Sequence, residues 1–233
     1  MLLLVVHQLW WTNRQARQGA QDKVQALERQ WEAAPTGGGQ SGETDGERVD
    51  EAGAAPSSPP TAGDGAAPES PPGRSSRERS APRWDQAYAV LRIPRLGVVA
   101  PVAQGIAKKG VLDKGYIGHY PQTAQPGEAG NFALAGHRNT HGEPFRRIDR
   151  LRAGDEIKVE TREGVYVYAV DRSLPQTSPR DTGVIERVPR SLVKPGAGYD
   201  EPGYYVTLTT CTPEYSSKHR LVVWGKLKSV KPR

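Results

Sequence analysis

The chain has 233 residues, a formal net charge of +6 and a single cysteine. One cysteine excludes an intramolecular disulfide framework, and this length allows one or two domains. The basic residues are scattered and no aromatic side chains are interleaved with them, which argues against a nucleic-acid-binding surface and favours a solvated basic surface.

The first eleven residues are strongly apolar and include the pair Trp10 and Trp11. This run is about half of the roughly 20 apolar residues that cross a bilayer. It has no basic start and no small-residue cleavage site, as a signal peptide would have. Paired tryptophans are typical of a membrane interface. We therefore interpret residues 1–11 as the distal part of a membrane anchor whose start lies upstream. The alternative is a short hydrophobic stub on a soluble protein.

Residues 12–32 are predicted to form a helix that continues from the anchor as a stalk. The segment lacks proline, and Val24, Leu27 and Trp31 fall on one narrow apolar stripe at helical spacing. Residues 33–81 are almost entirely Gly, Pro, Ala, Ser, Thr and charged residues, which bury too little apolar surface to offset their ordering entropy. We interpret this segment as a disordered linker. Residues 82–233 then remain as one compact domain, large enough for a core without disulfides.

The domain is dominated by short β-rich runs. Strands are expected over residues 88–93, 98–102, 132–135, 156–160, 165–170, 204–210 and 220–227, with 156–160 and 165–170 forming a hairpin. Pro101 indicates an edge or a bulge. Pro144, followed by apolar residues three apart, predicts a short helix over 144–151. About eight short strands with few helices favour a closed β-barrel or a sandwich.

Three reactive side chains are expected at strand ends. Cys211 follows one strand, and Arg220 begins the next after a short loop. If these two strands pair antiparallel, the thiol and the guanidinium lie side by side. His137 follows Gly136 at the end of another strand. A thiolate attacks carbonyl carbons readily, an imidazole transfers protons and an arginine stabilises an oxyanion, so the set predicts a nucleophilic site.

Simpler interpretations exist for each of these residues. A lone cysteine is usually a small buried hydrophobe, although the polar threonines around Cys211 argue against a core position. His137 and His141 have the i, i+4 spacing of a metal site. Gly142 and Pro144 argue against a helix there, however, and no third ligand follows nearby in the sequence. No metal and no cofactor are therefore expected.

Five segments, taken in order, resemble the sequence signature of the sortases, which are cysteine transpeptidases on the outer face of Gram-positive membranes. The resemblance covers residues 88–227, and its predicted layout of anchor, stalk and catalytic domain also matches the family. The segments that carry it are Ile93–Gly97, Gly118–Pro121, Pro126–Phe132, Ala135–Arg138 and Thr207–Cys211 with Arg220 beyond. The resemblance implies a closed eight-stranded sortase-type β-barrel with a few short helices, preceded by a disordered linker and an N-terminal helix.

Within the family the chain is most similar to class E, the housekeeping sortases of high-GC actinobacteria. Gly118–Pro121, Gly136–Thr140 and Thr209–Pro213 carry this similarity. It implies a sorting signal of the type Leu-Ala-X-Thr-Gly, with Tyr120 at the position thought to favour alanine. His141 departs from the subclass, which usually carries tyrosine or a similar residue there.

The resemblance also implies the roles of the site residues. Cys211 is the nucleophile at the Thr–Gly bond, His137 the proton donor and acceptor, and Arg220 the oxyanion-stabilising residue. Tyr120, Thr210 and His141 are expected to contact substrate. The implied partners are surface proteins with a C-terminal sorting signal and a peptidoglycan precursor amine of the lipid II type, with no nucleic acid. The implied location is the cell membrane, as a single-pass protein with its catalytic domain outside the cytoplasm.

Three alternatives remain. A pilin-polymerising sortase would use a lysine side chain as acceptor and often has a lid over its site; Trp84 and Asp85 are the one short sequence that resembles such a lid. An L,D-type transpeptidase would carry Ser-His-Gly-Cys, where this chain has Leu208–Cys211. A non-catalytic adhesion module would not need Cys211, His137 and Arg220 together.

Overall fold

The computed structural model describes residues 2–33 and 82–233. The predicted linker over 33–81 lies outside the described residues, apart from its first position. The described residues form one long helix, eight strands and four 3-10 turns, η1 to η4. In chain order these are α1 (Leu2–Glu32), β1 (Ala87–Ile93), η1 (Pro94–Leu96), β2 (Val98–Gln104), η2 (Leu112–Lys114), β3 (Ile117–His119), β4 (Gly130–Ala135), η3 (Ile148–Arg150), β5 (Glu156–Glu160), β6 (Gly164–Thr177), η4 (Thr182–Ile185), β7 (Tyr204–Thr212) and β8 (His219–Pro232).

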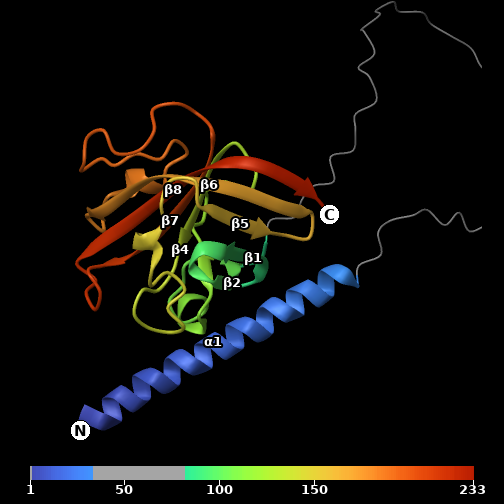
Figure 1. Ribbon diagram of the computed structural model, residues 1–233, viewed down its shortest axis with the longest axis vertical. Helices are drawn as coiled ribbons and strands as arrows, with labels where there is room; N and C mark the ends of the chain where they lie inside the picture. The colour runs from blue at the N-terminus through green and yellow to red at the C-terminus, as the bar shows by residue number, and fades with distance from the viewer. Residues whose placement is uncertain (1, 34–81) are drawn as a thin grey trace, which may run out of the picture. The chain divides into compact units, whose positions relative to one another are not determined.

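The eight strands close into one barrel (Figure 1), in the order β1-β2-β3-β4-β7-β8-β6-β5. Neighbouring strands are antiparallel, except for the parallel pairs β2–β3 and β4–β7. Alternate residues of the strands point inward, because successive side chains of a strand lie on opposite faces. Large interior side chains include Leu91, Ile93, Phe132, Phe145, Ile157, Tyr168 and Leu208. The closed barrel confirms the predicted fold and decides against a sandwich.

Most strands lie where the sequence pattern places them, and the exceptions have physical reasons. Strand β3 was not predicted, because three residues are too few to show an alternating pattern. The helix predicted over 144–151 is wrong: only Ile148–Arg150 forms a 3-10 turn. Pro101 lies in β2 before its pairing with β3 begins at Val102, so its missing N–H leaves no gap in that ladder.

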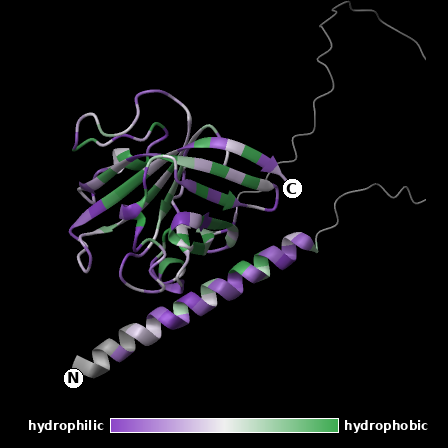
Figure 2. Cartoon of the chain, in the orientation of Figure 1, coloured by the Kyte–Doolittle hydropathy of each residue, from purple (hydrophilic) through white to green (hydrophobic). Residues whose placement is uncertain are grey.

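The N-terminal helix packs on the barrel through one side. Ala16, Ala20, Val24 and Leu27 recur at helical spacing and are buried, and the last two contact Val90, Ala103 and Val111. Each fully buried Val or Leu side chain stabilises such packing by at most about 1.5–3 kcal/mol. Figure 2 shows the coloured part of α1 as largely hydrophilic outside this side, with isolated apolar positions. No helix in residues 2–33 and 82–233 has an apolar stretch long enough to cross a membrane. The anchor and stalk roles stay predictions.

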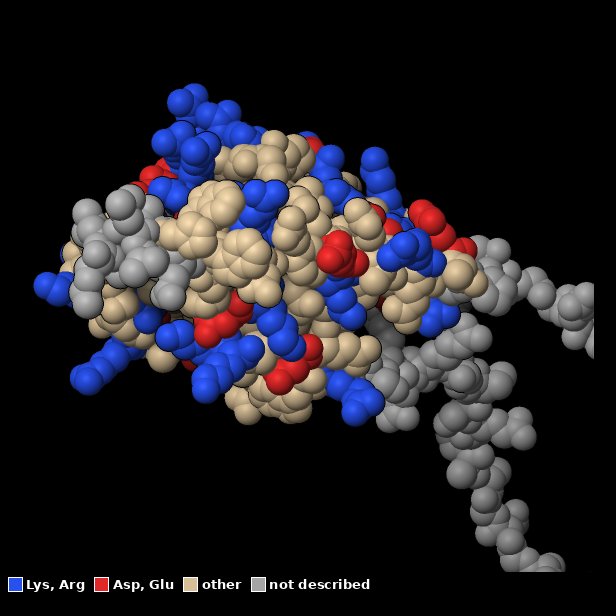
Figure 3. Space-filling view, turned by 90° about the horizontal axis from the view of Figure 1, so that it is seen from below, with Lys and Arg blue, Asp and Glu red and all other residues tan. Residues whose placement is uncertain are grey.

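Charged side chains are dispersed over the surface. Figure 3 shows Lys and Arg spread among uncharged residues on one face, with Asp and Glu between them. Several of these side chains form ion pairs: Arg92 with Glu28 and Glu160, and Lys226 with Asp171. Such partly exposed pairs contribute about 0–1 kcal/mol each. The pattern fits a solvated basic surface.

Candidate active site

Cys211 and Arg220 are placed by the backbone ladder between β7 and β8. The antiparallel register pairs Cys211 directly with Arg220. Directly opposed residues project their side chains on the same face of a sheet, within a few ångströms of each other. Val206 and Leu208 point into the barrel core. By alternation Cys211 therefore lies on the outer face, where it is partly accessible.

His137 follows strand β4, which runs parallel to β7. Their register pairs Ala133 with Thr207 and ends with Ala135 opposite Thr209. His137 follows Ala135 by two residues, as Cys211 follows Thr209, so both residues lie at the same end of this strand pair. The residues on either side of His137 hold it there. The Thr210 hydroxyl donates to the Gly136 carbonyl at 2.8 Å.

Arg138, on the other side of the histidine, continues this attachment. Its Nη1 donates to the carbonyl of Cys211 at 3.3 Å and to Oγ1 of Thr212 at 2.8 Å. Arg138 is buried. Hydrogen bonds from a charged donor are stronger than neutral ones, so these two bind the histidine segment firmly to the end of the cysteine strand.

Gly136 is required beside the histidine by close packing. A Cβ on Gly136 would come within 2.6 Å of the ring of Phe145. Phe145 is fully buried, and its backbone N–H donates to the His137 carbonyl at 3.1 Å. The ring and the hydrogen bond together fix the backbone that presents the imidazole.

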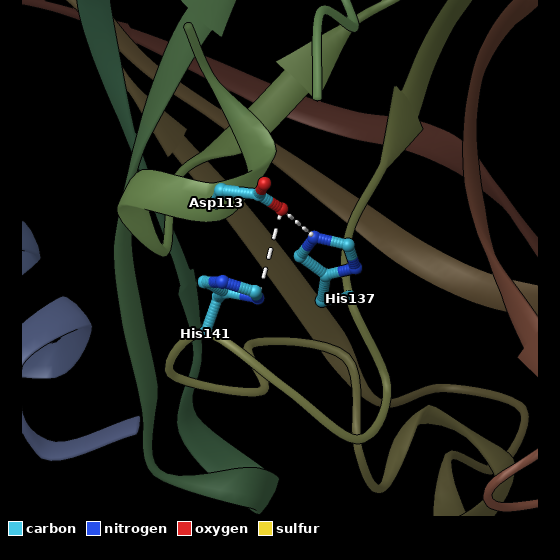
Figure 4. Close-up of side chains that lie close together, drawn as sticks. All are labelled: Asp113, His137 and His141. Carbon is cyan, nitrogen blue, oxygen red and sulfur yellow. Dashed lines mark hydrogen bonds and ion pairs between the residues drawn. The ribbon is translucent and has the colours of Figure 1, made fainter. Parts of the chain in front are cut away.

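The imidazole of His137 has a carboxylate partner that sequence reasoning missed. Nε2 of His137 lies 2.8 Å from Oδ1 of Asp113, in η2 (Figure 4). Nδ1 of His141 lies 3.6 Å from the same oxygen, and the two imidazole rings stack at 5.3 Å. Asp113 precedes His137 by 24 residues in a turn with no motif of its own, so no local pattern could have identified it.

This arrangement sets which nitrogen of His137 can transfer a proton. A carboxylate only accepts, so Nε2–H donates to Asp113 and Nδ1 is left to hold or release the second proton. Burial lowers the pKa of the neighbouring His141, and His137 and Lys108 lower it further against the opposing effect of Asp113. The two imidazoles thus have different environments.

The same three side chains are the candidate metal ligands among the described residues. One atom each of Asp113, His137 and His141 lie within 4.8 Å of one another. Imidazole nitrogens and a carboxylate oxygen are the donors that Zn²⁺ accepts. The sequence analysis lacked a third ligand, and the fold supplies Asp113. The hydrogen bond between His137 and Asp113 and the stacking of the two imidazole rings account for the approach of these groups without an ion.

Arg220 is anchored by the loop before it. Its Nη1 donates to the carbonyls of Ser217 and His219, at 3.0 Å each. A guanidinium has five N–H donors in a rigid fork, so other donors remain for an oxyanion at Cys211. Arg220 also pairs with Thr177 of β6. Thr177 and Ser191 both donate to the buried Asp181, which holds the β6–β7 connection beside the site.

The predicted substrate-binding residues contact or adjoin β7 and His137. The Thr209 hydroxyl donates to the Leu134 carbonyl at 3.0 Å, so at 3.1 Å the Tyr120 hydroxyl acts as donor to Thr209. Thr210 is buried, and its hydroxyl donates a hydrogen bond to the Gly136 carbonyl. His141 lies beside His137. Contacts of these residues with substrate stay predictions. Trp84 and Asp85 lie against Gly105 and Gly110, in the segment that leads to Asp113.

A buried histidine supports Tyr120 from inside the barrel. His119 is fully buried against Phe132, with its Nε2 2.9 Å from Oγ1 of Thr123 and 3.1 Å from the carbonyl of Ala124. A carbonyl only accepts, so Nε2 carries the hydrogen. Nδ1 is then an acceptor, and it lies 3.0 Å from the Tyr88 hydroxyl and 2.9 Å from the side-chain amide of Gln104. Burial lowers the pKa of His119 to about 4, which keeps the ring neutral.

Comparison with known proteins gives a consistent set of relatives. A sequence profile described as Sortase domain matches residues 91–228. Sortase SrtE1 of Streptomyces coelicolor is 42% identical over all of this chain, which spans about half (54%) of that relative's length. Sortase SrtE2 of the same organism is 32% identical over 97% of this chain and 76% of its own length.

Solved structures give the same result. The crystal structure of sortase E1 from Streptomyces coelicolor with a tripeptide in the active site is 51% identical, with a TM-score of 0.60, and the match covers 64% of this chain and 92% of that one. Sortase E from Streptomyces avermitilis is 41% identical with a TM-score of 0.56, covering 64% and 93%. These folds agree with the barrel described above.

Proposed function

The chain belongs to the sortase family, and from that premise we propose that it is a cysteine transpeptidase that cleaves a Leu-Ala-X-Thr-Gly-type signal between Thr and Gly. The observation that supports this most strongly is the arrangement of β4, β7 and β8. The β7–β8 register pairs Cys211 with Arg220, and the β4–β7 register ends with Ala135 opposite Thr209, two residues before His137 and Cys211. This supports a nucleophile, an anion-stabilising group and a proton carrier at the same end of the sheet.

In the proposed reaction the thiolate of Cys211 attacks the Thr carbonyl, and Arg220 donates to the developing oxyanion. The Thr–Gly bond breaks as His137, in the imidazolium form, gives the Nδ1 proton to the departing glycine amine. A thioester joins the substrate to Cys211. An incoming amine then attacks the thioester, neutral His137 takes its proton, and the thiolate is regenerated. Asp113 holds the ring oriented through its hydrogen bond with Nε2.

The alanine preference is proposed from Tyr120. Its hydroxyl reaches across β4 to Thr209, so the ring lies over the strand that leads to Cys211. We propose that this ring narrows the space for the second signal residue. The acceptor is proposed to be a cell-wall precursor amine, with signal-bearing surface proteins as donors. The proposed location is the outer face of the membrane, held there by a single N-terminal anchor.

The test is a pair of peptides that differ only in Ala or Pro at the second signal position, assayed with an amine acceptor. Thr–Gly cleavage with formation of the amide product supports the transpeptidase. A clear preference for Pro would overturn the class E assignment and leave the transpeptidase in place. A lysine-containing acceptor in parallel distinguishes the pilin-polymerising alternative.

A further inference from the structure

The N-terminal helix makes a concentrated set of polar contacts with one short loop of the barrel, residues 140–143. The Asn13 amide nitrogen donates to Oε1 of Glu143 at 2.9 Å, and its oxygen accepts from the Gly142 N–H at 3.3 Å. Arg17 donates from Nη2 to Oε2 of Glu143 at 2.9 Å and from Nε to the Gly142 carbonyl at 3.2 Å. Two side chains of α1 thus form hydrogen bonds with both the backbone of Gly142 and the carboxylate of Glu143.

Glu143 depends on these partners. Its side chain is only 4% exposed, so its carboxylate has exchanged water for protein donors. The donors are Asn13, Arg17 and Arg146, and two of the three come from α1. A buried carboxylate that loses part of its hydrogen bonding is strongly destabilised. The loop conformation is therefore coupled to the docked helix.

The loop is also held in a conformation that it would not adopt freely. His141, Gly142 and Glu143 have φ angles of 52°, 84° and 53°. Left-handed backbone costs non-glycine residues about 1–2 kcal/mol each, so His141 and Glu143 stay there only while their surroundings hold them. The clamp from α1 acts directly on the two residues that follow His141.

The helix also touches the segment that carries Asp113. Gly115 ends the η2 turn with a φ of 78°, and a Cβ there would lie 2.9 Å from the Ala16 carbonyl and 3.2 Å from the His141 carbonyl. Helix, turn and loop therefore meet at Gly115. The two groups that flank the imidazole of His137, Asp113 and His141, come from the two segments that α1 contacts.

We propose that Asn13 and Arg17 are positioning residues for His137, so that α1 acts as part of the catalytic unit in addition to any linking role. The effect passes through His141 and Asp113 and does not involve contact with substrate. The proposal rests on the proposed function, because it assigns His137 the proton-transfer role. Its physical content is that a docked α1 holds the 140–143 loop and the η2 turn where His141 and Asp113 flank the imidazole of His137.

The charged groups around the two imidazoles come from several elements. Asp113 lies on η2, and Lys108, on the preceding loop, acts electrostatically on His141. Arg138 lies beside His137 in sequence and pairs with Asp149 at 3.6 Å. Release of the 140–143 loop moves His141 relative to Asp113. The orientation of the His137 ring is then no longer fixed, and the coupling between imidazole and thiol that the alkylation profile reports is altered.

The test compares two variants of the full 233-residue chain. Asn13→Ala/Arg17→Ala removes the clamp. The matched control, Glu28→Gln, removes a different ion pair between α1 and the barrel, that with Arg92, which keeps Glu160 as a partner. The first readout is the rate of Cys211 alkylation by iodoacetamide as a function of pH, which needs no substrate and is unambiguous because the chain has one cysteine. The second is the separation of kcat from KM with the Leu-Ala-X-Thr-Gly peptide.

In the double variant we expect the alkylation midpoint to shift by about 0.5 pH unit, roughly threefold in the thiol–thiolate equilibrium. We also expect kcat to fall about tenfold with KM little changed. Arg17→Lys, which keeps the charge, should recover part of both effects. A double variant with the wild-type midpoint, or an equal change in Glu28→Gln, would overturn the proposal. If no variant cleaves the peptide, the proposed function fails, and the alkylation profile still decides whether α1 sets the environment of the cysteine.

Discussion

The two halves of the candidate site are held in different ways. Cys211 and Arg220 are fixed by the backbone ladder of β7 and β8, in which each position is set by its neighbours along the strand. His137 lies beyond the end of β4, and its environment depends on side chains from η2, the 140–143 loop and α1. A ladder is broken only by large changes, whereas side-chain contacts can be changed one at a time. The histidine half is therefore the half that is open to adjustment.

The largest loss of activity is expected when the nucleophile, which the β7–β8 ladder positions, is removed. Cys211→Ala should lower peptide cleavage by at least about 10³-fold, because no other thiol exists in the chain. The melting temperature should hardly change, because the residue lies at a partly exposed strand end. A fluorogenic peptide assay and thermal unfolding measure the two effects. Wild-type-like cleavage by this variant would refute the assignment of the nucleophile.

The next prediction tests the histidine half of the candidate site, which is held by side-chain contacts. Asp113→Asn keeps the shape but removes the charge that faces Nε2 of His137. We expect kcat to fall about 10- to 100-fold, because the His137 ring loses the carboxylate that orients it. Asp155→Asn, which removes a carboxylate that pairs with Arg95 elsewhere on the barrel, is the control. Equal losses in both variants would mean that Asp113 acts only on folding.

A pH-dependent change in stability tests the buried support beneath Tyr120. The pKa of His119 is lowered to about 4 in the folded protein, against an ordinary value of 6.5. The unfolded chain therefore takes up a proton first as pH falls, and the stability due to neutral His119 is lost between about pH 6.5 and 4. The loss should amount to about 2 kcal/mol from pH 7 to 5. Urea unfolding at both pH values measures it, and the difference should shrink in His119→Gln. An unchanged difference in that variant would assign the pH dependence to other groups.

The smallest expected effect concerns substrate preference. Tyr120→Phe keeps the ring and removes the hydrogen bond to Thr209. We expect the preference for Ala over Pro peptides to narrow about threefold, because the ring gains freedom over the strand. Competition between the two peptides in one reaction measures the ratio. The mutation should leave Cys211 alkylation unchanged, so a shifted alkylation profile would indicate a wider disturbance of the site.

The sequence itself determined the elements with a strong local signal. The short β-rich runs predicted seven of the eight strands. The expectation that Cys211 and Arg220 lie side by side if their strands pair antiparallel is confirmed by the register. Ordered motifs around His137 and Cys211 indicated the family, because several spaced segments agree together. The three-residue β3 and the 3-10 turn at Ile148–Arg150 were not predicted, since both are too short for periodicity to define them.

Only the tertiary structure decided the surroundings of the histidine. Asp113 is 24 residues from His137 in sequence, and Arg17 is 126 residues from Glu143. Nothing in the local pattern of either segment marks these contacts. They arise because barrel closure brings η2 beside the end of β4, and because the apolar side of α1 packs on the barrel and orients the polar residues between. The strand pattern is local and can be read from the sequence, whereas the partners of a loop are set by which distant segments the fold brings to it.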